Sequence, residues 1–202
     1  MGVGTALAMA EGQHHPGTTL ACVAVSLLLQ VGVNLHNDHA DASSGADTEA
    51  RLGPARATAQ GWITPATVLR AAYLALALAG LVGLYLVSIG GWPILAAGIA
   101  SVLAALAYTG GPFPLGYRGL GEVLVFTFFG LVATAGTFFL HTGAVSNLAL
   151  WAASAIGALA SAILVVNNLR DRETDRACQK NTLAVLLGPR RTRIEYTFLV
   201  AY

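Results

Sequence analysis

Residues 71–110 read AAYLALALAGLVGLYLVSIGGWPILAAGIASVLAALAYTG and contain no charged side chain. A helix needs about 20 consecutive apolar residues to cross the hydrocarbon core of a bilayer. The segment is therefore long enough for two crossings, and the pair Gly90-Gly91 lies near its middle. We expect one membrane-spanning helix over 66–89 and a second over 92–108, joined by a tight turn.

Long uncharged segments recur through the rest of the chain. No charged residue occurs from 18 to 35, and none lies between Glu122 and Arg170. The sequence thus predicts an all-α, polytopic transmembrane helical bundle that forms a single domain over 1–202. Shorter apolar runs at 1–10 and 194–202 are incomplete spans, so we expect a chain truncated at both ends. The five full spans are predicted over 18–40, 66–89, 92–108, 121–141 and 146–169.

The composition agrees with a membrane protein. Hydrophobic residues make up 55% and charged residues 10% of the 202-residue chain, whereas soluble domains average about 25% charged residues. Intrinsic disorder is excluded, because it requires low hydrophobicity and high charge. The formal net charge is +1, so the chain has no basic excess to neutralise phosphates, and we expect no nucleic-acid partner. No feature of the sequence indicates a protein partner.

The basic residues predict the orientation of the chain in the bilayer. When the five spans are threaded through the membrane, all 11 Lys and Arg residues fall on, or just inside, one face. The opposite loops, 11–17, 90–91 and 142–145, contain none. Because basic loops face the cytoplasm, we expect a multi-pass protein of the cell (inner or plasma) membrane. Its long polar loops, 41–65, 109–120 and 170–193, would then be cytoplasmic.

A first group of polar residues lies where the span 18–40 reaches that face. Its sequence is NLHNDHAD, residues 34–41. With about 100° between successive residues on a helix, Asn34, Asn37, Asp38 and Asp41 fall within one arc of roughly 100°. The acidic character continues to Asp47 in the following loop.

A second group, NNLRDRETD at residues 167–175, lies at the end of the span 146–169. Asn168, Asp171 and Asp175 share one face if the helix continues through them. An even number of crossings separates the two groups, so both emerge on the same side of the membrane.

Carboxylates beside hydrocarbon are costly unless they face a polar cavity or one another, and two facing acidic groups repel unless a cation lies between them. Carboxylate and amide oxygens suit Mg²⁺, which completes its coordination with water and phosphate oxygens. The pattern therefore favours Mg²⁺ ions that hold a diphosphate. We expect the Asp and Asn side chains of the two groups to supply the oxygen ligands. Arg51, Arg56, Arg170, Arg172 and Lys180 lie in the same loops and are available to neutralise the remaining charge.

Other interpretations of these residues stay open. A single Asp-rich helix end is most often a solvated boundary or a helix cap, although two matched groups make that less probable. His36 and His39 suggest zinc, but a polar supporting role is favoured because zinc sites usually have fuller His or Cys sets. Glu122 either faces the cavity or is a first-turn acid favoured by the helix dipole. Trp62 and Tyr117 are assigned to the membrane interface as aromatic anchors.

Three stretches together resemble the UbiA superfamily of intramembrane prenyltransferases. They are NLHNDHADASSGADTEARLGPARAT (34–58), YTGGPFPLGYRGLGE (108–122) and VVNNLRDRETDRACQKNTLAVLLG (165–188). Within that superfamily they are most similar to the 1,4-dihydroxy-2-naphthoate polyprenyltransferases of menaquinone synthesis. The N-D-x-x-D pattern alone is not specific; the extended first stretch and the Y-T-G-G-P loop favour the naphthoate branch.

The resemblance implies nine helices around a central cavity and two Asp-rich motifs that bind Mg²⁺. It implies transfer of a polyprenyl group from polyprenyl diphosphate to 1,4-dihydroxy-2-naphthoate, with loss of CO₂ and diphosphate, giving demethylmenaquinone. The first motif maps to Asn37, Asp38 and Asp41, preceded by Asn34, and the second to Asn168, Asp171 and Asp175. By this resemblance we expect the metal-binding residues to be Asp38, Asp41, Asp47, Asp171, Asp175, Asn37 and Asn168, with Asp38, Asp41, Asp171 and Asp175 as the catalytic acids. The substrate-binding residues expected for such a site are Asn34, Asn37, Asn168, Arg51, Arg56, Tyr108, Arg172 and Lys180.

The chain departs from the family pattern at three places. The lysine that many branches carry after the region of Tyr108 is absent. Gly45 occupies a position where other branches have an acid, with Asp47 as a nearby substitute, and Cys178-Gln179-Lys180 replaces an expected Ala-Gly-Lys. Three alternative functions remain. The chain is another UbiA-type aromatic prenyltransferase, an inactive fragment, or, in a different class, an ion or metabolite transporter.

Overall fold

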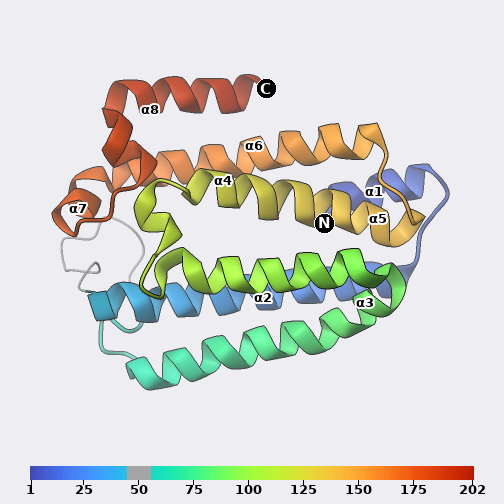
Figure 1. Ribbon diagram of the computed structural model, residues 1–202, viewed down its shortest axis with the longest axis horizontal. Coiled ribbons are helices and arrows are strands. Elements are labelled where there is room, and N and C mark those ends of the chain that lie inside the picture. Colours follow the sequence, from blue (N-terminus) through green and yellow to red (C-terminus); the bar gives the residue numbers. More distant parts are fainter. Residues whose placement is uncertain (45–55) are drawn as a thin grey trace.

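The computed structural model describes residues 1–44 and 56–202, and within these ranges it contains helices and no strand (Figure 1). The 3₁₀ helix η1 (Leu115–Arg118) and the π-helix η2 (Phe126–Ala135) lie on either side of the helix α4 (Gly121–Val125). The α-helices are α1 (Gly2–Ala10), α2 (Pro16–Ser44), α3 (Pro65–Thr109), α4 (Gly121–Val125), α5 (Gly136–Thr142), α6 (Asn147–Arg170), α7 (Arg172–Ala177) and α8 (Leu183–Ala201).

The α3 element consists of two helices that fold back on one another. Gly91 interrupts the helical backbone with φ 64° and ψ −148°, and Pro93 opens the second half. A positive φ of this kind is readily adopted by glycine, which has no Cβ. Figure 1 shows the two halves running in opposite directions on either side of this turn. The predicted pair of helices separated at Gly90-Gly91 is thereby confirmed.

Four helical stretches are long and apolar enough to cross a membrane among the residues described: 16–43, 65–109, 121–142 and 147–170. Because α3 folds back at Gly91, these correspond to the five predicted spans. The stretch 121–142 is a single rod built from α4, η2 and α5. The predicted all-α membrane bundle is therefore confirmed.

The rod 121–142 and α6 approach each other closely at a pair of glycines. A Cβ added to Gly130 would lie 2.5 Å from the Cα of Gly157, and one added to Gly157 would lie 2.8 Å from the carbonyl oxygen of Phe126. Small residues at such crossings let helix backbones pack tightly in membranes, where no hydrophobic force drives association. This contact fixes η2, and with it the rod 121–142, against α6, the helix that leads into the second Asp-rich group.

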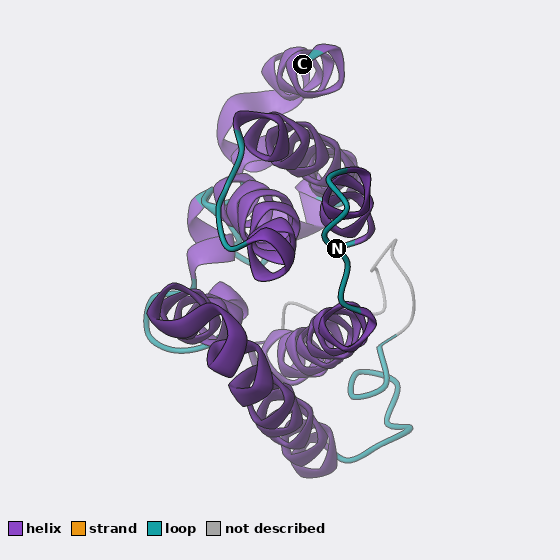
Figure 2. Ribbon diagram, turned by 90° about the vertical axis from the view of Figure 1, so that its right-hand side faces the viewer, coloured by secondary structure: helices purple, strands orange, loops and turns teal. Residues whose placement is uncertain are grey.

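Packing divides the long helices into two groups, which Figure 2 shows nearly end-on. One group is α2 with both halves of α3, and the other is the rod 121–142 with α6 and α8. The polar ends of α2, α3 and α6 lie at one end of the molecule, together with η1 and α7 (Figure 1). This end is called the acidic end below, and the end with the Gly91 turn is called the distal end.

Candidate active site at the acidic end

The first Asp-rich motif lies on α2, which continues without interruption to Ser44. Asn37, Asp38 and Asp41 are buried, as expected for residues on one inward-facing side of a helix. Asn34 differs, because its side chain is exposed and its amide donates to the carbonyl oxygen of Gln30 at 2.9 Å. The structure therefore brings three of the four predicted α2 residues into the interior and leaves Asn34 at the margin.

Asp41 is held by Tyr117 and Arg56, which come from two other segments, and by Lys180, described below. The hydroxyl of Tyr117, in η1, donates to its Oδ1 at 2.6 Å. The Arg56 guanidinium lies 3.8 Å from its Oδ2. Asp41 is only 2% exposed, and a buried carboxylate needs such charged and hydrogen-bonding partners to offset its lost hydration.

The other two inward-facing residues of α2, Asp38 and Asn37, accept hydrogen bonds from other segments of the chain. The backbone N–H of Thr58 donates to Asp38 Oδ1 at 3.3 Å. The hydroxyl of Thr109, at the end of α3, donates to Asn37 Oδ1 at 2.7 Å within a buried environment. These contacts attach the chain after the first motif, and the end of α3, to the inward face of α2.

The second Asp-rich motif does not form one continuous helix. The α6 helix ends at Arg170, Asp171 adopts a non-helical conformation, and α7 begins at Arg172. The turn is closed by the backbone N–H of Asp175, which donates to the carbonyl oxygen of Asp171 at 2.8 Å. The condition for a single shared face is therefore not met, and Asn168, Asp171 and Asp175 have separate partners.

Lys180 joins the two motifs. Its ammonium lies 4.0 Å from Asp41 Oδ2 and 3.8 Å from Asp175 Oδ1. It also lies 5.1 Å from the centre of the Tyr117 ring, a cation–π distance. The two acidic groups therefore meet at one end of the bundle, with Asp41 and Asp175 as the pair that shares a cation.

Asp171 and Arg172 are paired with their immediate neighbours. Both guanidinium contacts of Arg170 to the Asp171 carboxylate measure 2.7 Å. Arg172 forms an ion pair with Glu173. Asp171 and Arg172 thus lie close to the site in sequence, and the contacts found for them among residues 1–44 and 56–202 are with adjacent side chains.

Asn168 faces inward through Glu122, the first-turn acid of α4. Its amide donates to Glu122 Oε1 at 2.8 Å, and Ser161 donates to the Glu122 carbonyl oxygen at 3.0 Å. Glu122 is 7% exposed, and within the described part of the chain its Oε2 has no hydrogen-bond partner. Of the two interpretations left open for Glu122, the structure favours the inward-facing one.

Tyr108 lies in the same region, where two glycines leave room for it. A Cβ at Gly121 would be 3.1 Å from the Tyr108 hydroxyl, and one at Gly116 would be 3.2 Å from its ring. These glycines allow the phenol to pack between η1 and the start of α4. Tyr108 is thus placed beside Glu122, the residue that follows Gly121.

Two predicted site residues, Asp47 and Arg51, lie outside the described residues. In the ranges 1–44 and 56–202, no three Asp, Glu, His or Cys side chains are close enough to hold one metal ion. The donor chemistry nevertheless fits Mg²⁺, which typically takes one or two carboxylates and fills its coordination with water and phosphate oxygens. Asp41 and Asp175 supply two carboxylates, and the Lys180 ammonium between them shows that the pair accommodates a cation.

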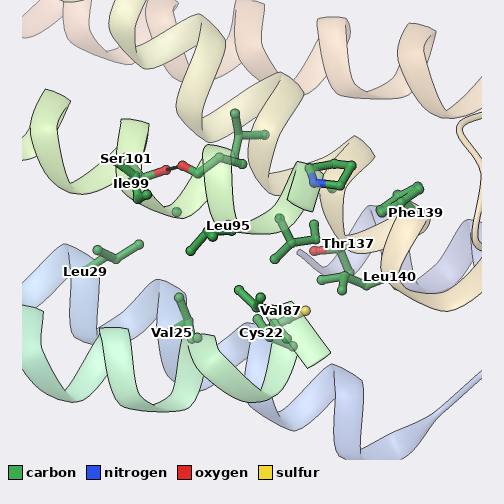
Figure 3. A pocket seen from close by; sticks show the side chains of 18 of the residues that line it. Cys22, Val25, Leu29, Val87, Leu95, Ile99, Ser101, Thr137, Phe139 and Leu140 are labelled. Atoms are coloured by element: carbon green, nitrogen blue, oxygen red, sulfur yellow. Dashed lines mark hydrogen bonds between the residues drawn. The ribbon is translucent and has the colours of Figure 1, made fainter. Parts of the chain in front are cut away.

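An apolar cavity of about 670 Å³ lies between the helices toward the distal end (Figure 3). Side chains of α2, both halves of α3 and α5 line it, among them Val25, Leu29 and Leu95. Leu29 lies about 12 Å along α2 from Asn37, given the rise of a helix. Cavities of 300–1,000 Å³ are of the usual size for small-molecule sites.

Comparison with known proteins agrees with this geometry. The model of the UbiA prenyltransferase family matches residues 1–202. The chain belongs to the UbiA prenyltransferase family. It is 44% identical over 182 residues to the 1,4-dihydroxy-2-naphthoate octaprenyltransferase of Mycobacterium tuberculosis. The matched region covers 90% of this chain and 62% of that protein.

Two further relatives carry the same description. The Escherichia coli protein is 40% identical over 194 residues, covering 92% of this chain and 62% of its own length. The Bacillus subtilis protein is 31% identical over 202 residues, covering 99% of this chain and 65% of its own length. This UbiA-family chain therefore spans 62–65% of the length of these three relatives.

Sequence reasoning missed three residues of this UbiA-family site. Tyr117 was assigned to the membrane interface, but its hydroxyl binds Asp41. Thr109 and Thr58 were not singled out, although they bind Asn37 and Asp38. Their positions in the polar stretches that resemble the family were the only available signal, because loop residues have no periodicity that shows where they point.

Proposed function

We propose that the protein transfers a polyprenyl group from polyprenyl diphosphate to 1,4-dihydroxy-2-naphthoate in an Mg²⁺-dependent reaction. The single observation that carries the proposal is the meeting of the two Asp-rich motifs through Lys180 at one end of a bundle that also encloses an apolar cavity. A prenyl diphosphate needs a charged environment for its diphosphate and an apolar environment for its hydrocarbon tail. The named relatives, described as octaprenyltransferases of the same acceptor, support the choice of substrates.

The residues that would hold Mg²⁺ are Asp38, Asp41, Asp171 and Asp175, with Asn37, Asn168 and Asp47 as further oxygen donors. When bound, the metal would supply electrostatic stabilisation of the negative charge that develops on the leaving diphosphate. Arg56 and Lys180 already contact Asp41, so their cationic groups are placed to neutralise diphosphate oxygens. Arg51, Arg172, Asn34 and Tyr108 complete the proposed substrate-binding set.

The bond changes follow from the substrates. The allylic C–O bond breaks and its electron pair leaves with the diphosphate. The electron-rich naphthoate ring then attacks the allylic carbon, and the ring carboxylate departs as CO₂, which restores the aromatic hydroxylated ring of demethylmenaquinol, the reduced form of demethylmenaquinone. Half-buried polar partners such as Tyr117 and Arg56 around Asp41 keep the site fixed, and preorganised groups of this kind stabilise developing charge.

The cavity serves the same reaction by holding the tail and excluding water. An allylic cation is quenched by water, so the reacting carbon must lie in a dry environment. The lining side chains named above are hydrocarbon, from both halves of α3 and from α2. We propose that the isoprenoid tail runs from the acidic end into this cavity, with the acidic end on the cytoplasmic side of the cell membrane.

The direct test uses membranes that contain the protein. They are incubated with 1,4-dihydroxy-2-naphthoate and several allylic diphosphates, and the product is identified by mass. We expect a prenylated, decarboxylated product that requires Mg²⁺ and disappears on chelation. Asp41→Asn and Asp175→Asn should each abolish it, whereas Glu11→Gln, an exposed change far from the site, should not.

Two outcomes would contradict the proposal. The first is unchanged turnover in both Asp variants. The second is the absence of any prenylated product from membranes in which the protein is inserted and folded.

A further inference from the structure

A cluster of aliphatic side chains lies toward the distal end of the apolar cavity. Leu86 and Leu140 belong to one buried core cluster, and Ile94 packs against it. These residues come from the first half of α3, from α5 and from the second half of α3, and all three line the cavity. We call this cluster the cavity floor.

One helical turn closer to the acidic end, each of these three helices carries a glycine. Side chains three or four residues apart lie on the same face of a helix. By that rule Gly83 shares a face with Leu86, Gly98 with Ile94, and Gly136 with Leu140. All three glycines line the cavity, so they form a glycine belt at one level above the floor.

The glycine belt faces empty space. A Cβ added to Gly83, Gly98 or Gly136 would meet no heavy atom within 4 Å. Gly90 shows the contrast, because a Cβ there would lie 2.3 Å from Ile94 and 3.0 Å from Leu140. Close packing therefore explains Gly90, whereas it does not explain the belt, whose missing side chains leave the cavity wide.

We propose that Gly83, Gly98 and Gly136 determine the length of isoprenoid tail that the protein accepts. The inference rests on the proposed function, which places the tail in this cavity with its diphosphate at the acidic end. A long tail must pass the belt to reach the floor, whereas a short tail ends before it. A bulky side chain at the belt would thus exclude long donors and spare short ones.

The experiment compares Gly83→Leu and Gly136→Leu with the unaltered protein, in membranes given geranyl and octaprenyl diphosphates in competition. Product masses give the ratio of long to short transfer. We expect each variant to lower this ratio about tenfold or more, the size of effect that steric discrimination in apolar pockets provides. Ala77→Leu is the matched control, because Ala77 is exposed on the same half of α3 and does not line the cavity.

A graded series guards against misfolding. Gly83→Ala, Gly83→Val and Gly83→Leu should lower the ratio stepwise while transfer of the geranyl group persists. Leu140→Ala should act in the opposite direction, because it removes part of the floor and lengthens the cavity.

The outcomes separate the two proposals. If the unaltered protein is active and every folded variant gives the same length ratio, the role of the glycine belt is overturned and the proposed function is not. No transfer from any donor by the unaltered protein would overturn the proposed function, and the belt's role with it.

Discussion

At the scale of single residues, Tyr117 is the contact that most directly tests how Asp41 is positioned. Tyr117→Phe removes the hydroxyl that lies 2.6 Å from Asp41 and keeps the ring beside Lys180. We expect kcat/KM to fall roughly tenfold or more, as for loss of a hydrogen bond to a charged group. Tyr73→Phe is the control, because Tyr73 is half exposed. Equal effects of the two changes would contradict a specific role for Tyr117.

Lys180 is predicted to compete with the metal for Asp41 and Asp175. Lys180→Ala removes a positive charge from between two carboxylates, and the remaining pair attracts a divalent cation more strongly. We expect tighter binding of Mn²⁺ to the protein without diphosphate, measured by electron paramagnetic resonance, together with slower prenyl transfer. Lys180→Arg keeps the charge and should resemble the unaltered protein in metal binding. Weaker Mn²⁺ binding by Lys180→Ala would overturn this role.

The motif residues could be predicted from the sequence because helical spacing and the even number of crossings together place Asp41 and Asp175 at one end. Their partners could not. Tyr117 lies in a loop between glycines and prolines, and nothing in that pattern distinguishes a side chain at the membrane interface from one that reaches a carboxylate. Contacts between distant segments, such as Thr109 with Asn37, depend on the packing of α3 against α2.

At the scale of helices, the crossing of the rod 121–142 with α6 depends on Gly130. In Gly130→Ala the new Cβ would lie 2.5 Å from Gly157 Cα and 2.6 Å from the Ala153 carbonyl oxygen. Both are backbone atoms, so the helices must separate, and we expect a loss of stability of about 1–3 kcal/mol. A thermal unfolding midpoint in detergent measures the loss.

Gly80→Ala is the matched control for Gly130→Ala. A Cβ at Gly80 would meet no heavy atom within 4 Å, and alanine is favoured over glycine inside a helix by about 0.5–1 kcal/mol. The unfolding midpoint of Gly80→Ala should stay level or rise. A fall as large as that of Gly130→Ala would show that the clash is not the cause.

The extents of the helices could largely be predicted from the sequence. The breaks within helices could be predicted only where a glycine marks them. Gly90-Gly91 signals the α3 turn in the sequence itself. The break at Asp171 has no such signal, because Arg170, Asp171 and Arg172 are all compatible with a continuing helix. There the structure interrupts the helix before α7, and the second motif is split between two helices.

At the scale of the whole molecule, the orientation in the membrane is the prediction that the arrangement of loops makes testable. Ala59 and Ala144 are exposed at opposite ends of the bundle. In a chain with Cys22→Ala and Cys178→Ser, Ala144→Cys should react with an impermeant maleimide in intact cells. Ala59→Cys should react only after permeabilisation. Labelling of Ala59→Cys from outside would place the acidic end on the wrong side.

The hairpin form of α3 has a mechanical corollary. The two halves are joined at Gly91, and both line the cavity. Any separation between them is therefore smallest at Gly91 and largest at their opposite ends. Those ends lie at the acidic end, where the Thr109 hydroxyl donates a hydrogen bond to Asn37. An isoprenoid tail that enters laterally from the lipid would therefore find the widest opening next to the site proposed for its diphosphate.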